Sequence, residues 1–500
     1  MAKVFIIEFL PFVLCGKKQS LTFENMKWFV SIVVLSIFFV SCKKESFITS
    51  VDARLSISAD TLSFDTVFTA IGSVTQFFKI RNDNNQKLRI SGIRLSGGTA
   101  SSYQLNIDGQ ATASASGVEL APNDSLYVFV KIAINQSTAN LPFIVRDSIK
   151  VDYNGNTKWV QLQAYGQNAR FLKNQKITTN TTWNNQLPYV ILGGVTVDTF
   201  ATLTIDRGTR IYCNANSPII VQGTLRVNGE RDTANRVYFR GDRLDAVYKD
   251  LPGGWPGIIF TNPSRANVLN YAVIKNAYQA LVVSGGIVNP VAKLTLNECI
   301  VDNAYDVGLF AFNSFINSRN CLFSNCGNDA NLGEGGSNVL VRGGGIYNFD
   351  YATITTFSNA YQLHKQPAVY LSNSGGGGTT APLTANFNNS IIYGEGGLTE
   401  NEIVTDKQTT TFGFVVNLNN TLYKVKTEPA NTTIAMSSIK NVNPVFDTIN
   451  TGRRIYNFRL RADVSPCINK GAINTTILTD LDGAPRKKGG ATDIGCYEKQ

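Results

Sequence analysis

A five-residue unit recurs in the second half of the chain and constrains the fold more than any other feature. Each unit begins with a small residue, has an aliphatic or aromatic residue third and ends in Asn. Clear copies occupy residues 272–276, 299–303, 321–325 and 355–359, and weaker copies begin at Ser390 and Thr421. The four terminal asparagines are 27, 22 and 34 residues apart, which indicates a coil with occasional insertions. Coils stacked about 4.8 Å apart would align the small, apolar and Asn positions, so we predict a parallel β-helix over residues 183–500.

Residues 51–168 have a different texture. Seven short segments alternate apolar and polar residues between turn signals such as Asn154-Gly155, which predicts an antiparallel β-sandwich of the Ig-like kind, with a spacer role. Residues 169–182 form the expected linker. The whole chain is therefore predicted to be all-β, and its charged content of 16%, without a Lys/Arg block, argues against nucleic acid as a partner.

The N-terminal region predicts export. Met26 is the expected start, and Lys27 precedes an apolar run of about 13 residues, too short for a membrane span, that ends in Val-Ser-Cys. We interpret residues 1–41 as an upstream extension plus a lipoprotein signal peptide, Cys42 as the lipid attachment site and residues 42–50 as a tether. The alternative is an uncleaved anchor helix. The expected location is the bacterial outer membrane, on the cell surface or the periplasmic face, with the lipid anchor as the membrane contact.

Cys321 and Cys326 are five residues apart, a spacing that raises the question of a metal site. No second cysteine pair lies nearby and His364 is the only histidine, so we predict no metal site. Cys321 matches Cys299 and Ala272 in the repeat, which favours a buried filler in the small-residue column over a local disulfide. Cys326 falls just outside the repeat unit.

Catalytic candidates are few. One histidine is too few for a polygalacturonase-type or Ser-His-Asp hydrolase site, but a polysaccharide lyase needs only a Lys or Arg base and a calcium-neutralised carboxylate. Lys275 and Asp302 occupy equivalent positions on neighbouring coils, with Glu298 nearby. The favoured interpretation is a cross-coil surface ion pair, and a catalytic role is the alternative. Calcium is expected only for a lyase, and otherwise we expect no cofactor.

Two loops contain further candidates. Tyr248 and Trp255 lie in DRLDAVYKDLPGGWPG, where they could bind a sugar ring, although the place of Trp255 in the repeat motif favours a role in covering the core. Asp480 and Asp482 in TDLDGAPR match only part of a calcium loop and are expected to be turn residues.

Two longer stretches carry a family resemblance. The stretch ATLTIDRGTRIY with the segments after it, and the ending SPCINKGAINTTILTDLDGAPRKKGGATDIGCYE, resemble the lipoproteins of Bacteroidota that join an Ig-like module to a right-handed parallel β-helix of the pectate-lyase-like kind. The resemblance covers nearly all of the mature chain and implies a right-handed, single-stranded β-helix with a C-terminal cap. Relatives usually carry Ala where this chain has Cys467 and Cys496, which suggests either a disulfide in the cap or two buried thiols.

The resemblance implies architecture and says little about chemistry. We therefore expect a cell-envelope protein that presents a β-helix for recognition or adhesion, of glycans above all, without catalysis. Two alternatives stay open: a carbohydrate-active enzyme, either a lyase or a glycoside hydrolase, and a purely structural envelope protein. Expected partners are a polysaccharide or other envelope proteins.

Overall fold

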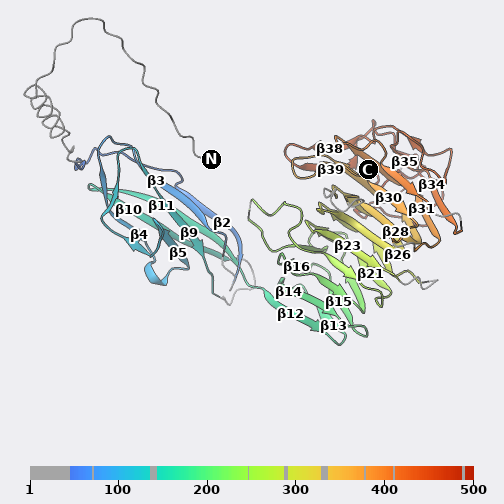
Figure 1. Cartoon of the computed structure of the whole chain (residues 1–500), viewed down its shortest axis with the longest axis horizontal. Coiled ribbons are helices and arrows are strands. Elements are labelled where there is room, and N and C mark those ends of the chain that lie inside the picture. The colour runs from blue at the N-terminus through green and yellow to red at the C-terminus, as the bar shows by residue number, and fades with distance from the viewer. Residues whose placement is uncertain are drawn as a thin grey trace, which may run out of the picture.

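The structure is a computed structural model that describes residues 46–69, 73–135, 143–245, 247–285, 291–327, 336–376, 379–408, 411–486 and 490–500. The predicted signal peptide and Cys42 lie outside these residues. The described residues form 39 strands and one short 3₁₀ turn, η1 (Gly98–Ala100). No helix within these ranges is both long and apolar enough to cross a membrane. The chain is all-β, with an N-terminal two-sheet unit beside a large parallel sheet (Figure 1).

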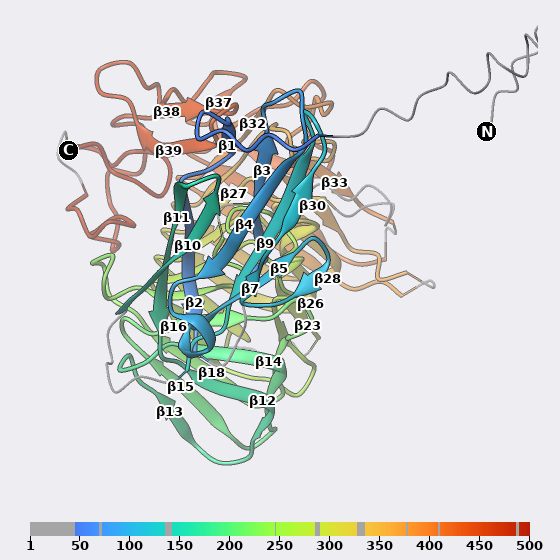
Figure 2. The same ribbon diagram turned by 90° about the vertical axis from the view of Figure 1, so that its left-hand side faces the viewer.

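The N-terminal unit is a sandwich of two sheets, seen in front of the parallel sheet in Figure 2. Its first sheet has the order β1-β3-β9-β5-β6 and its second the order β2-β11-β10-β4-β7, with β8 paired to β4. The strands are β1 (Leu55–Ile57), β2 (Thr61–Phe68), β3 (Gln76–Asn82), β4 (Leu88–Leu95), β5 (Tyr103–Ile107), β6 (Gln110–Ala111), β7 (Ser114–Ala115), β8 (Val118–Leu120), β9 (Ser125–Ile132), β10 (Phe143–Tyr153) and β11 (Asn156–Gln167). Alternate residues of both sheets share one apolar core, as the alternating sequence pattern requires.

The parallel sheet has 26 strands and is consistent with a β-helix, because each strand pairs with its counterpart one coil later. The paired strands are stacked in three columns. The first column contains β13 (Thr181–Trp183), β15 (Thr202–Asp206), β18 (Thr224–Asn228), β21 (Asn267–Asn270), β24 (Leu294–Asn297), β31 (Leu383–Asn388), β34 (Phe414–Asn419) and β36 (Thr432–Ile434). The second contains β16 (Arg210–Cys213), β19 (Val237–Gly241), β22 (Ala272–Lys275), β25 (Ile300–Asp302), β27 (Leu322–Ser324), β29 (Thr353–Phe357), β32 (Ile391–Glu395), β35 (Leu422–Tyr423) and β37 (Ile439–Lys440). The third contains β17 (Ile219–Val221), β20 (Ile258–Phe260), β23 (Gln279–Ser284), β30 (Val369–Ser372) and β33 (Ile403–Asp406). Four long strands bend from one column into the next: β12 (Arg170–Ile177), β14 (Tyr189–Val197), β26 (Val307–Arg319) and β28 (Val339–Asp350). The inward side chains of all three columns form one apolar core.

The terminal asparagines of the repeat mark a sharp turn after the second column. Asn276, Asn303 and Asn325 have φ angles of 60°, 60° and 49°. Asn tolerates this left-handed conformation better than most residues, so the turn explains why the unit ends in Asn. The side chains also stack, since Asn303 Nδ2 donates to Asn276 Oδ1 at 2.8 Å.

The structure contains the predicted small-residue column, but the fourth copy of the repeat begins three residues earlier than predicted, at Ala352 instead of Thr355. Thr355 pairs with Ser324, so Ala352 rather than Thr355 stacks on Cys321. Asn359 consequently lies outside the ladder. The column is made of Ala272, Cys299, Cys321, Ala352, Ser390 and Thr421.

The outward face of the first column carries ladders of amide side chains that the repeat did not predict. One runs through Asn317, Asn348, Asn386 and Asn417, where each Nδ2 donates to the Oδ1 one coil earlier at 2.7–2.9 Å. A second joins Asp350, Asn388 and Asn419 at 2.8 and 2.9 Å. We call this outward face the amide face.

The sandwich and the parallel sheet are joined without a long connection. Residues 170–177, expected within the linker, form β12 and pair with β14 as the first coil of the parallel sheet. A small apolar cluster includes Phe68 of the sandwich and Tyr212 of the coils, whose ring centroids are 4.9 Å apart. The two units therefore contact each other through side chains as well as through the chain.

The last described residues fold back along the second column. We call residues 443–486 and 490–500 the strap; it contains the antiparallel hairpin of β38 (Phe446–Asn450) and β39 (Ile455–Leu460). Strap side chains pack on outward apolar residues of the second column, among them Leu322, Ile391 and Leu422. Hydrogen bonds reach from the strap to coils as far back as Arg236, whose Nη2 donates to the carbonyl of Leu481 at 3.1 Å. The expected C-terminal cap thus lies along the side of the coils.

Candidate functional site

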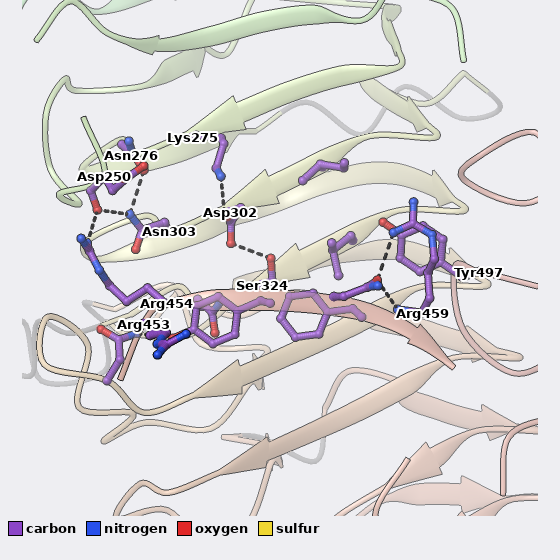
Figure 3. A pocket seen from close by; sticks show the side chains of 17 residues that line it. Asp250, Lys275, Asn276, Asp302, Asn303, Ser324, Arg453, Arg454, Arg459 and Tyr497 are labelled. Atoms are coloured by element: carbon purple, nitrogen blue, oxygen red, sulfur yellow. Dashed lines mark hydrogen bonds and ion pairs between the residues drawn. The ribbon is translucent and has the colours of Figure 1, made fainter. Parts of the chain in front are cut away.

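A groove of about 320 Å³ opens between the second column and the hairpin of the strap (Figure 3). Its floor comes from β22, β25 and β27 and the Asn turns after them, and its wall comes from the strap. The lining residues are Asp250, Lys275, Asn276, Ile300, Asp302, Asn303, Leu322, Ser324, Asn325, Asn359, Arg453, Arg454, Tyr456, Asn457, Phe458, Arg459 and Tyr497.

Three polar side chains cross the floor of the groove in register. Lys275, Asp302 and Ser324 occupy the same strand position on consecutive coils. Lys275 Nζ lies 2.9 Å from Asp302 Oδ2, and Ser324 Oγ donates to Asp302 Oδ1 at 2.7 Å. The Asp302 carboxylate raises the pKa of Lys275 above its usual value, which keeps the amine protonated. The pairing of Lys275 with Asp302 is the cross-coil arrangement that the repeat predicted.

The amide groups of the Asn turns fix one side of the groove. Asn276 Nδ2 donates to the carbonyl of Lys249 at 2.6 Å, and Asn303 Nδ2 donates to the carbonyl of Asp250 at 3.0 Å. Arg454 Nη1, from the strap, donates to the same Asp250 carbonyl at 3.0 Å. These bonds join the loop around Asp250, the coils and the strap, so the groove is a composite of three distant segments.

The wall of the groove combines aromatic and cationic side chains. The ring of Tyr456 stacks on Phe458 with centroids 5.9 Å apart, and its hydroxyl accepts a hydrogen bond from Asn359 Nδ2 at 3.2 Å. Burial is the main cause that raises the pKa of Tyr456, so the phenol stays neutral. Arg453 is exposed, and its guanidinium has no hydrogen-bond or ion-pair partner in the described part of the chain.

The lining as a whole is cationic. It contains four basic side chains, Lys275, Arg453, Arg454 and Arg459, and two carboxylates, Asp250 and Asp302, for a formal charge of +2. Arg459 is neutralised from outside the groove by Asp482, with Nη2 and Oδ2 2.6 Å apart.

Glu298 does not join Lys275 and Asp302. It is buried, and its Oε1 accepts from Arg319 Nε at 3.2 Å and from Asn320 Nδ2 at 3.1 Å. Its φ of 51° places it in the turn between the first and second columns, where it binds neighbouring residues and does not line the groove. Glu298 therefore does not support the Lys275 site, contrary to the expectation from the sequence.

The two aromatic candidates have different fates. Trp255 is fully buried in the coil core, and its Nε1 donates to the carbonyl of Lys275 at 2.9 Å. It covers the core, as the alternative interpretation expected, and cannot stack on a ligand. Tyr248 is 46% exposed and lies under the guanidinium of Arg243, 3.8 Å from its ring centroid. Tyr248 is not part of the groove lining.

The cysteines behave as apolar residues. Cys467 and Cys496 are free, buried thiols in the cluster beneath the strap, and the disulfide is absent in this structure. Burial raises the pKa of Cys467 to about 12, so it stays a thiol. Cys299, Cys321 and Cys326 are likewise free and buried in the coil core. Small apolar size is the property that these positions use.

Two acidic candidates and the histidine are engaged in internal contacts. Asp480 Oδ1 accepts from the backbone N–H groups of Asp482 and Ala484 at 2.9 and 2.7 Å, which is a turn role. His364 Nε2 lies 2.9 Å from Glu402 Oε1, and both side chains are buried. Within the described residues, no group of three or more His, Cys, Asp and Glu side chains is placed to hold a metal ion.

The sequence predicted the floor of the groove and missed its wall. Arg453, Arg454 and Tyr456 lie in TGRRIYNF, which has no repeat signature and is more than 150 residues from Lys275 and Asp302. An Arg-Arg pair after Thr-Gly, between two alternating segments, is a signal for a charged hairpin turn. Nothing in the sequence says which coil that turn contacts.

Comparisons with known proteins show no family. No protein-family model matches the chain, and no curated protein matches it in sequence. Among solved structures, parts of the chain overlap with a family 123 glycoside hydrolase from Clostridium perfringens (10% identity, TM-score 0.19, 26% of this chain and 30% of that one). Other overlaps are with the VesB protease of Vibrio cholerae (17% identity, TM-score 0.17, 23% of this chain and 31% of that one) and PapD-like domain 7 of human CEP192 (11% identity, TM-score 0.17, 26% of this chain and 92% of that one). The overlaps cover less than a third of the first two chains, and TM-scores this low carry no argument about fold or activity.

Proposed function

We propose that the groove binds an acidic glycan and that the protein serves surface recognition or adhesion without catalysis. The observation that carries the proposal is the exposed Arg453, which the strap sets beside the half-buried Arg454 and opposite the asparagine turns of the floor. Guanidinium groups bind carboxylates and sulfates with two parallel hydrogen bonds, and amides both donate to and accept from sugar hydroxyls. With Arg459 neutralised by Asp482, a formal charge of +1 remains, and the unpaired guanidinium of Arg453 favours a polyanion over a neutral sugar.

Aromatic and apolar contacts supply the remaining features of a sugar site. Tyr456 of the wall and Ile300 of the floor are half-buried and border the groove, whereas Phe458 and Leu322 are buried beneath them. Sugar rings have apolar faces that pack on such side chains while their hydroxyls reach the flanking amides. A groove of about 320 Å³ has room for one or two sugar units and continues to solvent.

The lyase alternative is less well supported. A lyase base must be neutral before it accepts a proton, but the Asp302 carboxylate raises the pKa of Lys275 and so favours the protonated amine. Arginines are protonated at all physiological pH values. Lys275 and Asp302 therefore fit a role in charge and hydroxyl recognition better than a role in β-elimination.

The envelope location is part of the proposal. What supports it is the lipoprotein-like sequence up to Cys42, together with the geometry of the sandwich, for which we retain the Ig-like assignment. Asn154 Nδ2 at one end of the sandwich donates to the carbonyl of Ile48 at 2.9 Å, whereas the coils begin after Gln167 at the other end of β11. The 12 residues of β11 would separate a membrane tether from the groove-bearing, right-handed β-helix by about 40 Å.

Binding and turnover of polygalacturonate by the full chain test the proposal. Arg453→Glu is expected to weaken binding about tenfold and more steeply at low salt, because it reverses the unpaired charge. Arg226→Glu is the matched control, since Arg226 is an exposed arginine on the first column, away from the groove. Equal binding by the two variants would contradict the groove assignment, and unsaturated products from the wild type would replace recognition with lyase activity. A Cys42→Ser variant that incorporates labelled fatty acid as fully as the wild type would contradict lipid attachment at Cys42.

A further inference from the structure

Three aromatic side chains lie together on the outer face of the first sheet of the sandwich. Phe77 of β3 is directly opposite Phe129 of β9, and Tyr127 is two residues from Phe129 on the same strand. Their exposed fractions are 50%, 38% and 40%. Outward positions on a sandwich are normally polar, so three exposed rings in contact need an explanation.

The rings form one continuous surface. The centroids of Phe77 and Tyr127 are 5.5 Å apart, those of Phe77 and Phe129 are 5.9 Å apart, and Tyr127 and Phe129 are 5.9 Å apart and within 14° of parallel. The inward neighbours Phe78, Val128 and Val130 are fully buried, so the core holds the two strands rigidly. We call Phe77, Tyr127 and Phe129 the aromatic platform.

The surroundings of the platform are cationic and amide-bearing. Lys79 Nζ lies 4.7 Å from the ring centroid of Tyr127, and Lys131 is the next outward residue of β9. Gln104 and Asn106 of β5 lie opposite Lys131 and Phe129. No outward position within β3, β5 and β9 carries a carboxylate; one acidic residue beside them is Asp108, exposed in the turn after β5, whose backbone N–H donates to the carbonyl of Tyr127 at 3.4 Å. The face therefore complements a negatively charged partner that has apolar surfaces and hydroxyl groups.

We propose that the aromatic platform is a second carbohydrate-binding surface, which takes an acidic polysaccharide chain. Its sugar rings would pack on the three aromatic rings while its carboxylates or sulfates approach Lys79 and Lys131. The choice of an acidic glycan rests on the proposed function of the groove, but the platform itself is a separate site. Self-association through this face is disfavoured, because it would bring the lysines of two copies together.

A polymer that reaches both sites would bind more tightly than either site alone. The groove lies on the coils and the platform on the sandwich, so two segments of one immobilised polysaccharide can engage them together. Linked binding of this kind raises the apparent affinity without any new contact. Long chains are therefore expected to bind more tightly than short fragments of the same polysaccharide.

The test measures retention of the full chain in gels that contain polygalacturonate. Phe77→Ala/Phe129→Ala is expected to weaken retention about tenfold, whereas Phe77→Tyr/Phe129→Tyr retains it because the ring faces remain. Trp159→Ala is the matched control, since Trp159 is 46% exposed on the opposite sheet of the sandwich. Lys79→Glu/Lys131→Glu is expected to weaken retention in polygalacturonate and to leave any weak retention in its neutral methyl ester unchanged.

The outcomes distinguish the two sites. Loss of retention in the platform variant alone supports the platform and overturns the groove, and loss in Arg453→Glu alone does the reverse. Retention of the platform variant equal to that of the wild type overturns this inference, as does an equal loss in Trp159→Ala. A platform variant that changes only self-association by light scattering, or only binding to anionic vesicles, also overturns it. Thermal unfolding of each variant separates a lost contact from a lost fold.

Discussion

The first and second columns of the parallel sheet make an instructive pair. Both turn apolar side chains inward, and both stack at the same spacing. Outward, the first column carries the amide face, where Asn348 and Asn386 are half-buried, whereas the second column carries residues such as Leu322 and Ile391 that the strap covers. The outward residues therefore report whether another segment lies on top of a column.

The groove lies where outward residues covered by the strap meet outward residues that are polar. On each second-column strand of the groove floor the outward residue changes from apolar to polar over two positions. On β25 it changes from Ile300 to Asp302, and on β27 from Leu322 to Ser324. Lys275 continues the polar row on β22. The strap covers the apolar part and leaves the polar part open. A site thus arises at the boundary of a covered surface, and the loop between β19 and β20 adds Asp250 to its lining.

Placing an amide on the covered column should have the largest effect. Ile391→Asn is expected to lower the free energy of unfolding by about 4 kcal/mol, because it removes a fully buried side chain and leaves a polar group without water. Urea titration of the full chain measures this change. Ile391→Val, expected to cost about 1 kcal/mol, is the control for loss of volume. A cost for Ile391→Asn as small as that of an exposed substitution would show that the strap does not cover the column.

The buried ion pair within the strap should have the next largest effect. Arg486 Nη1 lies 3.2 Å from Glu498 Oε2, and both side chains are fully buried. Glu498→Ala is expected to cost about 3 kcal/mol, because it leaves Arg486 buried without its carboxylate. The exposed pair of Lys426 and Glu400, 2.8 Å apart, is the comparison, and Glu400→Ala should cost less than about 1 kcal/mol. Equal urea midpoints for the two variants would contradict the role of burial.

On the amide face the expected effect is smaller. Asn386→Ala removes the bonds to Asn348 and Asn417 and should cost about 1 kcal/mol, since each such bond contributes little where water can replace it. The measurement is again the urea midpoint. Asn386→Ser, which keeps a hydroxyl at this position, should fall between the wild type and Asn386→Ala. A cost above that of Glu498→Ala would reverse the ranking of the two columns.

The smallest effect is expected from the ion pair at the boundary. The folded state raises the pKa of Lys275, so its contribution to stability is complete below the unfolded value of about 10.4 and is lost as the pH rises through the raised value. Because the side chain is 40% exposed, this contribution is a few tenths of a kcal/mol. The free energy of unfolding of the wild type should fall slightly more between about pH 10 and pH 12 than that of Lys275→Met. A larger loss in the variant would contradict the pairing.

The repeat predicted the stacked coils, and its errors have a physical origin. The segment ATITTFSN contains two overlapping frames that satisfy the same pattern of small, apolar and polar residues. The frame that begins at Ala352 is the structural one, because Thr353 pairs with Leu322 and Thr355 with Ser324. Side-chain type alone cannot separate frames three residues apart when both place an apolar residue third. The position of the preceding turn, at Tyr351 with a φ of 53°, decides between them.

The candidate site was predictable only in part for a related reason. Lys275 and Asp302 belong to the repeat, so their register follows from the spacing of the units. Arg453 and Arg454 reach the groove through the strap, whose path depends on apolar packing of Phe446 and Phe458 on the coils. Packing of this kind has no periodic signature in the sequence. The fate of Trp255 was equally undetermined, since a loop tryptophan can face inward or outward.

The strap also changes how the coils share their stability. A stack of repeats behaves as a one-dimensional chain, in which each coil senses only its neighbours and can unravel from a free end. The strap connects Asn320 to Thr479, Thr353 to Cys496 and Arg236 to Leu481, so coils far apart in the stack are held by one segment. Unravelling of any coil that the strap contacts then requires release of a segment shared with other coils. The strap thus adds coupling between distant coils to the coupling between neighbours. The coils it contacts are expected to unfold together in one all-or-none transition, as a compact domain does.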